Sequence, residues 1–372
     1  MGQIDIRKNN FNLLRLLAAT QVMVVHVSGH LGLDWGRAHY ILEHFPGVPI
    51  FFAISGFLIS ASYERNPNLL QYSRNRGLRI FPALWACLAV SIALAYFVGG
   101  IRFPLLQTVP WLIAQTTFAQ FYNPDFLRQF GVGVLNGSLW TISVELQFYA
   151  AVPLIYFLIG KYRTNLKLLC ATAVFAAFHI FVVAAPEIGI INSISPAYKL
   201  TAIFLPTYLY LFMVGVLLQR NYAFLSRWLE GKGLFWLVAY IAIAFSATHF
   251  GGARLGNNLN PLLAVMLAFT VVSLAVTAPQ LSKSLLGDKD VSYGVYIYHM
   301  PIVNSLLALH VAGAIWVPIA AALTYLAAFA SAKLIEEPAL RMKRNPLHPV
   351  ASSPEEQQAS KHVAASVRLK AK

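Results

Sequence analysis

Long apolar segments separated by short polar stretches run through most of this 372-residue chain. A helix that crosses the hydrocarbon core of a bilayer needs about 20 predominantly apolar residues. The segments that come close to this length are residues 11–28, 44–62, 80–99, 138–159, 167–186, 199–218, 233–250, 259–278, 291–310 and 313–335. The pattern therefore predicts an all-α integral membrane protein with about ten transmembrane helices.

A further apolar stretch, residues 105–122, contains Pro110 and several Gln and Thr residues. It fits either an eleventh span or a segment at the membrane interface. With ten spans and a cytoplasmic N-terminus, 23 of the 28 Lys and Arg residues fall on the cytoplasmic side, as the positive-inside rule requires. An eleventh span would move the basic clusters at 161–167 and 220–232 to the outside. We therefore expect ten spans with both termini cytoplasmic.

The membrane domain is expected to cover residues 1–344. Residues 345–372 carry Pro, Ser, Gln and charged residues without periodicity, and they are expected to form a disordered cytoplasmic tail. No internal repeat suggests the inverted repeats of many transporters. No appended soluble catalytic domain is visible in the sequence either, so any chemistry is expected within the membrane body and its loops.

The composition supports a lipid environment. Hydrophobic residues make up 58% of the chain and charged residues 11%, against roughly 25% charged in soluble proteins, and the mean hydropathy is +0.61. A net charge of +14 in a soluble protein would suggest nucleic-acid binding, but here the basic residues lie between apolar segments, so membrane lipid is the expected partner and nucleic acid is not. Cys87 and Cys170 lie inside apolar runs, and no Cys/His spacing resembles a zinc site, so neither disulfides nor a metal are expected.

Ionisable side chains inside predicted spans are costly in lipid and are therefore candidates for function. Arg15 and His26 lie eleven residues apart in the first span, which places them on one helical face and about 16 Å apart along the axis. That distance is of the order of an extended phosphopantetheine arm, with Arg15 near the cytoplasmic end and His26 near the outer end. A snorkelling arginine and an interfacial histidine explain the same residues.

Three other charged residues belong to the same group of candidates. Arg76 and Arg79 share a helical face at the cytoplasmic entrance of the third span. They either bind phosphate bidentately or anchor the helix against anionic lipid. Glu145 lies about two turns from the outer face in the fourth span, at a depth comparable to that of His26. A Glu145–His26 pair would orient the imidazole for general-base catalysis.

Ser55, Trp140 and His299 are weaker candidates for lining the same cavity. Ser55 precedes Gly56, and such a small pair favours close helix contact, whereas Trp140 also suits an interface or packing role. His299 falls in the middle of the ninth predicted span, where it either lines the site or hydrogen-bonds to a neighbouring helix. The long outer loop 100–137 combines aromatic and short polar side chains, which suits a sugar acceptor as well as an interfacial belt.

These segments together resemble the acyltransferase 3 family of membrane-bound acyltransferases. The matching motifs occur in family order over residues 9–341 and are NNFNLLRLLAATQVMVVH, SGFLIS, RGLRIFPALW, SLWTISVELQFY, SYGVYIYHMPI and EEPALR. One departure is visible at Leu146, where many members carry a second consecutive acidic residue. Glu145 is therefore the sole carboxylate of that motif.

The resemblance implies a multi-pass enzyme of the bacterial inner membrane. Such enzymes transfer an acyl group, usually acetyl, from cytoplasmic acyl-CoA to an extracytoplasmic saccharide or glycolipid. By resemblance, His26 would be catalytic and Arg15 its partner on the donor channel. Arg76 and Arg79 would bind the phosphates of coenzyme A, and Glu145 would support His26 or the acceptor. The alternative is a non-enzymatic carrier or flippase for a sugar-linked or lipid substrate, in which case no thioester is cleaved. Neither reading defines the saccharide or the oligomeric state.

Overall fold

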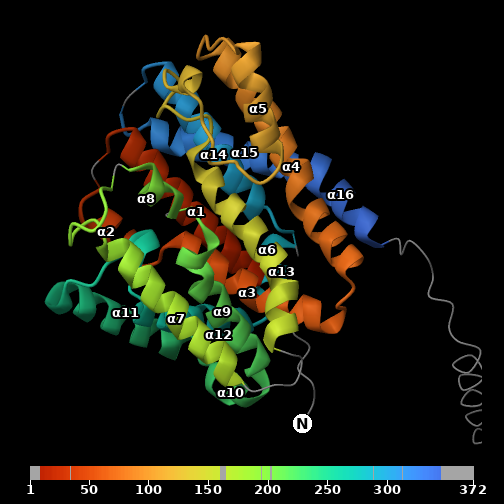
Figure 1. The fold of residues 1–372 in the computed structure, drawn as a ribbon, viewed down its shortest axis with the longest axis vertical. Coiled ribbons are helices and arrows are strands. Elements are labelled where there is room, and N and C mark those ends of the chain that lie inside the picture. The colour runs from red at the N-terminus through yellow and green to blue at the C-terminus, as the bar shows by residue number, and fades with distance from the viewer. Residues whose placement is uncertain are drawn as a thin grey trace, which may run out of the picture.

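The computed structural model describes residues 9–33, 35–159, 165–193, 195–201, 203–287, 289–311 and 313–344. All regular secondary structure within these ranges is helical. The predicted tail, residues 345–372, lies outside the described residues. In Figure 1, α1, α3 and α14 lie in the middle of the bundle, with α4 and α16 on one flank and α11 on the other.

The long helices follow the predicted apolar segments. They are α1 (Phe11–His30), α3 (Gly47–Arg65), α4 (Leu69–Phe97), α6 (Trp140–Ile159), α7 (Asn165–Ala184), α9 (Leu205–Arg220), α11 (Gly233–Gly251), α12 (Pro261–Val276), α14 (Ser292–Ala308) and α15 (Trp316–Ser331). Shorter helices connect them, namely α2 (Arg37–Glu43), α5 (Leu105–Thr116), α8 (Pro196–Thr201), α10 (Tyr222–Leu229), α13 (Leu281–Leu286) and α16 (Glu337–Arg341). A π-helical turn, Ala332–Glu336, joins α15 to α16.

Eight helical segments in the described part of the chain are long and apolar enough to cross a membrane. The other two predicted spans correspond to α12, with 16 residues, and α14, with 17 residues. At 1.5 Å per residue these two helices reach about 24–26 Å, slightly less than a hydrocarbon core of about 30 Å. The structure therefore supports a multi-pass membrane protein, while the number ten and the cytoplasmic placement of both termini stay predictions.

The ambiguous stretch 105–122 contains only a 12-residue helix, α5, which at about 1.5 Å per residue is too short to span. The prediction that loop 100–137 presents its aromatic side chains to an acceptor is wrong for Trp111, because that side chain is fully buried against Leu127 and Phe130. The loop is also anchored to α14. Asn304 donates from its side-chain amide to the carbonyl oxygens of Val134 and Leu135, at 2.9 and 3.0 Å.

Because of these contacts with α14, the chain enters the helical bundle before α6 begins. The side-chain amide of Asn136 donates to the carbonyl oxygen of Ile297 at 2.8 Å, halfway along α14. One turn further on, the hydroxyl of Thr141 lies 2.6 Å from that of Tyr296. Helix α6 therefore starts beside the middle of α14, and Glu145 lies deeper in the protein than its distance from the predicted end of the span suggests.

Helices α3 and α9 approach each other at two glycines. A Cβ atom added at Gly56 would lie 2.0 Å from the carbonyl oxygen of Phe212 on α9. One added at Gly215 would lie 2.2 Å from the carbonyl oxygen of Ala53 on α3. These contacts involve backbone atoms, which cannot turn away as a side chain can. The packing role predicted for the Ser55–Gly56 pair is confirmed for Gly56.

The variant Gly56→Ala is expected to be destabilised by about 1–3 kcal/mol, because α9 must move to admit the methyl group. Thermal unfolding of the purified protein in detergent measures this as a lower unfolding temperature. The matched control is Gly29→Ala in α1, where an added Cβ has no heavy atom within 4 Å. Equal unfolding temperatures for the two variants would contradict the close approach of α3 and α9.

Candidate active site

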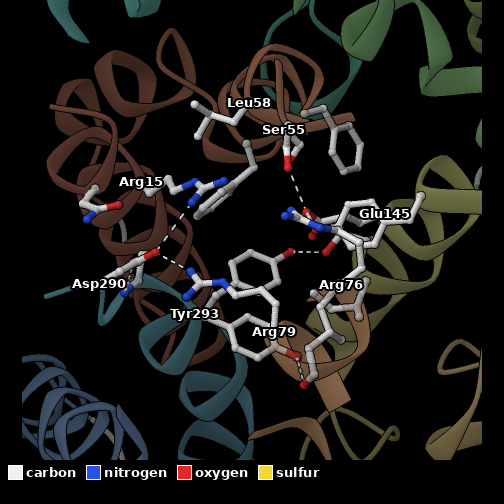
Figure 2. A pocket seen from close by; sticks show the side chains of 18 of the residues that line it. Arg15, Ser55, Leu58, Arg76, Arg79, Glu145, Asp290 and Tyr293 are labelled. Atoms are coloured by element: carbon white, nitrogen blue, oxygen red, sulfur yellow. Dashed lines mark hydrogen bonds and ion pairs between the residues drawn. The ribbon is translucent and has the colours of Figure 1, made fainter. Parts of the chain in front are cut away.

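A cavity of about 420 Å³ opens between α1, α3, α4, α6 and the start of α14. Figure 2 shows side chains from these elements converging on it. Its charged lining residues are Arg15, Arg65, Arg76, Arg79, Lys343, Glu145 and Asp290. Five cations thus face two carboxylates, so the cavity carries excess positive charge. A positively charged pocket of this kind favours a ligand with several negative charges, such as a polyphosphate.

Asp290 joins the two arginine-bearing helices and was not predicted as a site residue. Its carboxylate forms ion pairs with Arg79 and, at 3.6 Å, with Arg15, and it accepts hydrogen bonds from the backbone and hydroxyl of Ser292. Burial raises the pKa of Asp290, but the two guanidinium groups and the Ser292 hydrogen bonds outweigh burial and lower the pKa to about 2. The carboxylate is therefore charged at neutral pH and holds both arginines at the cavity wall (Figure 2).

Arg76 faces the same cavity with an incompletely satisfied guanidinium. Its charged group lies over the rings of Tyr72 and Tyr149, at 6.0 and 5.7 Å from the ring centroids. Its Nε atom is buried without a hydrogen-bond partner among the described residues. A buried unpaired donor on a cation is costly and is satisfied by an anionic acceptor. The predicted common face of Arg76 and Arg79 is confirmed, since both line the cavity.

Lys343 adds a cation that the sequence pattern assigned only to the general positive charge of the inner side. It lies just after α16 and reaches the cavity wall. Burial, with repulsion from Arg76 and Arg79, lowers the pKa of Lys343 to about 7. A phosphate bound nearby would favour its charged form, because opposite charges stabilise each other in a partly buried site.

Glu145 belongs to this cavity and does not contact His26. It accepts hydrogen bonds from the hydroxyls of Ser55, at 3.0 Å, and Tyr149, at 2.5 Å. The predicted Glu145–His26 pair is therefore wrong in this structure. The reason is that α6 begins beside the middle of α14, which places Glu145 at the wall of the cavity that Arg15 also lines and not beside His26 on α1. The prediction that Ser55 lines the cavity is confirmed.

His26 pairs instead with His299. Nδ1 of His26 lies 2.9 Å from Nε2 of His299, and the ring centroids are 5.2 Å apart. His299 is completely buried, whereas His26 is partly exposed. Neither ring lines the cavity that holds Arg15, so the prediction that His299 lines that cavity is wrong. The alternative predicted for His299, a hydrogen bond to a neighbouring helix, is confirmed by its contact with His26 on α1.

The histidine pair nevertheless adjoins the end of the cavity. Tyr296 lines the cavity and its ring lies 6.0 Å from that of His299, one turn further along α14. Helices α1 and α14 are packed side by side, with Arg15 and Asp290 in contact at one end and the two histidines at the other. On α1 the separation of Arg15 and His26 corresponds to about 16 Å. The arrangement is a charged pocket followed by a histidine pair.

Trp140 has no part in this arrangement. Its ring lies 5.3 Å from that of Tyr208 on α9 and packs, partly buried, against the apolar core, which agrees with the alternative packing role. The prediction that Trp140 lines the cavity is therefore wrong, although its neighbours Thr141 and Ile142 do line it. In the described part of the chain, no cluster of three or more His, Cys, Asp or Glu residues could hold a metal ion.

Comparisons with known proteins identify the family to which this chain belongs. A family model described as an acyltransferase domain matches residues 8–334. Nodulation protein 10 of Rhizobium leguminosarum bv. viciae is 35% identical over 354 residues, which are 90% of this chain and 94% of that protein. An O-acetyl transferase of Shigella phage Sf6 is 25% identical over 80% of this chain and 85% of its own length.

A partial relative is the peptidoglycan O-acetyltransferase OatA of Listeria monocytogenes, which is 27% identical over 42% of this chain and 25% of its own length. No solved structure matches the chain. Because the family model covers nearly the whole chain, the protein belongs to the acyltransferase 3 family. It is therefore an acyltransferase, and two of its relatives are named O-acetyltransferases.

Proposed function

We propose that this protein transfers an acyl group, most simply acetyl, from cytoplasmic acyl-CoA to a hydroxyl of an extracytoplasmic saccharide. The observation that carries the proposal is the cavity with five cations and two carboxylates that ends beside the His26–His299 pair. The proposed location is the bacterial inner membrane, because acyl-CoA is a cytoplasmic compound.

The donor side of the proposal rests on Arg15, Arg76 and Arg79. Arg76 has a buried donor atom without a partner among the described residues, and Arg15 and Arg79 share one carboxylate between them. Guanidinium groups bind phosphate oxygens through paired charge-assisted hydrogen bonds. The phosphates of coenzyme A would bind here, and the pantetheine arm would extend toward Tyr296. In this proposed pose the thioester would lie next to the histidine pair, because Tyr296 adjoins His299.

The acceptor side of the proposal rests on His26. In one route its imidazole removes the proton of the acceptor hydroxyl, whose oxygen bonds to the acyl carbon as the carbon–sulfur bond breaks. In the other route the imidazole attacks the thioester first and then passes the acyl group to the hydroxyl. In both routes coenzyme A leaves as the thiol. A saccharide is proposed as the acceptor because one relative is named a peptidoglycan O-acetyltransferase.

Purified protein in liposomes with acetyl-CoA and a crude glycolipid or polysaccharide fraction is expected to release free thiol and to acetylate the saccharide. A thiol-reactive dye follows the first product, and mass spectrometry follows the second. The control is the same mixture with liposomes that lack the protein. Transport of a labelled saccharide without any thioester cleavage would refute the proposal and would favour a carrier or flippase.

A further inference from the structure

The hydrogen bond between His26 and His299 joins two rings from helices far apart in the sequence. Besides its 2.9 Å contact with Nδ1 of His26, His299 has its own Nδ1 3.3 Å from the carbonyl oxygen of Val295, one turn earlier on α14. The other rings near the pair are those of His30 and Tyr296, each with its centroid 6.0 Å from that of one of the two histidines. In the described part of the chain, neither histidine hydrogen-bonds to a carboxylate.

These contacts define where the protons of the two rings lie. A carbonyl oxygen only accepts hydrogen bonds, so Nδ1 of His299 carries the proton in its contact with Val295. A neutral imidazole has one donor and one acceptor nitrogen, which makes Nε2 of His299 an acceptor. The complete burial of His299 disfavours a second proton on its ring. Nδ1 of His26 must therefore donate to Nε2 of His299, and Nε2 of His26 carries the free lone pair.

We propose that His299 is a positioning residue that holds His26 in the tautomer with a reactive Nε2. The inference rests on the proposed function of His26 and adds the group that prepares it. In catalytic triads a carboxylate orients the histidine in this way; here a buried neutral histidine, itself oriented by a backbone carbonyl, does so. When Nε2 of His26 takes the proton of the acceptor hydroxyl, the Nδ1–H bond to His299 stays intact, and no charge has to move onto the buried ring.

The same orientation serves both routes of transfer. As a base, Nε2 of His26 accepts the proton while the hydroxyl oxygen bonds to the acyl carbon and the thiolate leaves. As a nucleophile, Nε2 itself bonds to the acyl carbon while the carbon–sulfur bond breaks and the thiolate leaves. The hydroxyl oxygen then bonds to the acyl carbon as the bond to Nε2 breaks, and the hydroxyl proton goes to the thiolate. With the opposite tautomer, Nε2 would carry a proton and could do neither.

The test compares His299→Gln, His299→Asn and His299→Leu. The amide oxygen of glutamine reaches the position of the imidazole Nε2 and can accept from His26, whereas the shorter asparagine reaches only the position of Nδ1. We expect His299→Gln to keep kcat within about tenfold of wild type, and His299→Asn and His299→Leu to lose roughly 10²-fold in kcat. KM for acetyl-CoA should stay nearly unchanged in all three, because the charged cavity is intact.

Coenzyme A affinity and elution as a single species in gel filtration confirm that each variant is folded. A purely structural role for His299 would give Gln and Asn variants of similar kcat, and that result would overturn the inference. So would a wild-type kcat in His299→Leu. The variant His26→Ala, measured alongside, separates this inference from the proposed function. If His26→Ala is inactive while His299→Leu is fully active, only the inference fails; if His26→Ala is fully active, the proposed function fails as well.

Discussion

Replacing His26 with Ala is expected to reduce kcat for acyl transfer by at least about 10³-fold, the effect of losing a base or nucleophile that acts in the transition state. Donor affinity should change little, because His26 lies beyond the end of the charged cavity and does not line it. The loss should therefore appear in kcat and not in KM for acetyl-CoA. Initial rates of thiol release at several donor concentrations separate the two constants.

The matched control for this substitution is His30→Ala. His30 lies one turn after His26 on α1, with its ring centroid 6.0 Å from that of His26, and it is exposed. It is expected to keep nearly full activity. An active His26→Ala variant would remove His26 from the chemistry, and an inactive His30→Ala variant would show that the effect is not specific to His26.

Replacing Arg76 and Arg79 together with Met is expected to weaken coenzyme A binding by about 10³-fold, since each charge-assisted hydrogen bond contributes roughly 1.5–3 kcal/mol. The single variants should separate the contribution of each arginine to donor binding from its contribution to stability. Arg76→Met removes a guanidinium that forms no ion pair with another described residue, so it should lower donor affinity with little loss of stability. Arg79→Met also leaves the largely buried Asp290 carboxylate with a single ion pair, its 3.6 Å contact to Arg15, beside the hydrogen bonds from Ser292.

Because Arg79 forms an ion pair with Asp290, its replacement should lower the stability of the protein as well as its donor affinity. Removing one member of a buried ion pair typically costs about 3–5 kcal/mol, and the remaining contact with Arg15 should keep the cost at the lower end of that range. Arg79→Met should therefore unfold at a lower temperature than Arg76→Met. Adding Asp290→Asn to Arg79→Met should restore the unfolding temperature without restoring donor affinity.

Isothermal titration with coenzyme A measures donor affinity, and thermal unfolding measures stability. The control is Arg74→Met, which is on the same helix but does not line the cavity and hydrogen-bonds to the carbonyl oxygen of Met342. Wild-type affinity in the double arginine variant would contradict the assignment of this cavity to the donor phosphates. A similar loss in Arg74→Met would point to a general effect of positive charge.

Much of the site was predictable because it depends on spacing within one helix. Arg76 and Arg79 are three residues apart, and helical geometry alone places them on one face. The same reasoning puts Arg15 and His26 on one face of α1 at different depths, and the structure confirms that order, with Arg15 in the charged cavity and His26 in the histidine pair. The contact role of Gly56 also follows from a local signal, since a small residue in an apolar helix permits close approach.

The partners of these residues could not be predicted in the same way. His299 is 273 positions from His26 in the sequence, and Asp290 is 211 positions from Arg79. Asp290 precedes a predicted span in a short polar segment, and no local pattern distinguishes it from an ordinary charged loop residue. Glu145 was assigned the wrong partner because its depth was counted from the end of an apolar segment, whereas the loop before α6 enters the bundle and lowers the start of that helix.

The sequence by itself determined that the chain is a helical membrane protein, which family it belongs to, and which charged residues lie at unusual positions in its spans. The membrane class and the unusual charged positions follow from the length, hydropathy and periodicity of single segments, whereas the family follows from the resemblance of the sequence motifs to the acyltransferase domain. Only the tertiary structure decided which of those residues meet. It placed Glu145 with Ser55 and Tyr149, and it paired His26 with His299. The physical reason is that hydrogen bonds and ion pairs depend on the relative depth and rotation of neighbouring helices, and these are set by side-chain packing between segments far apart in the chain.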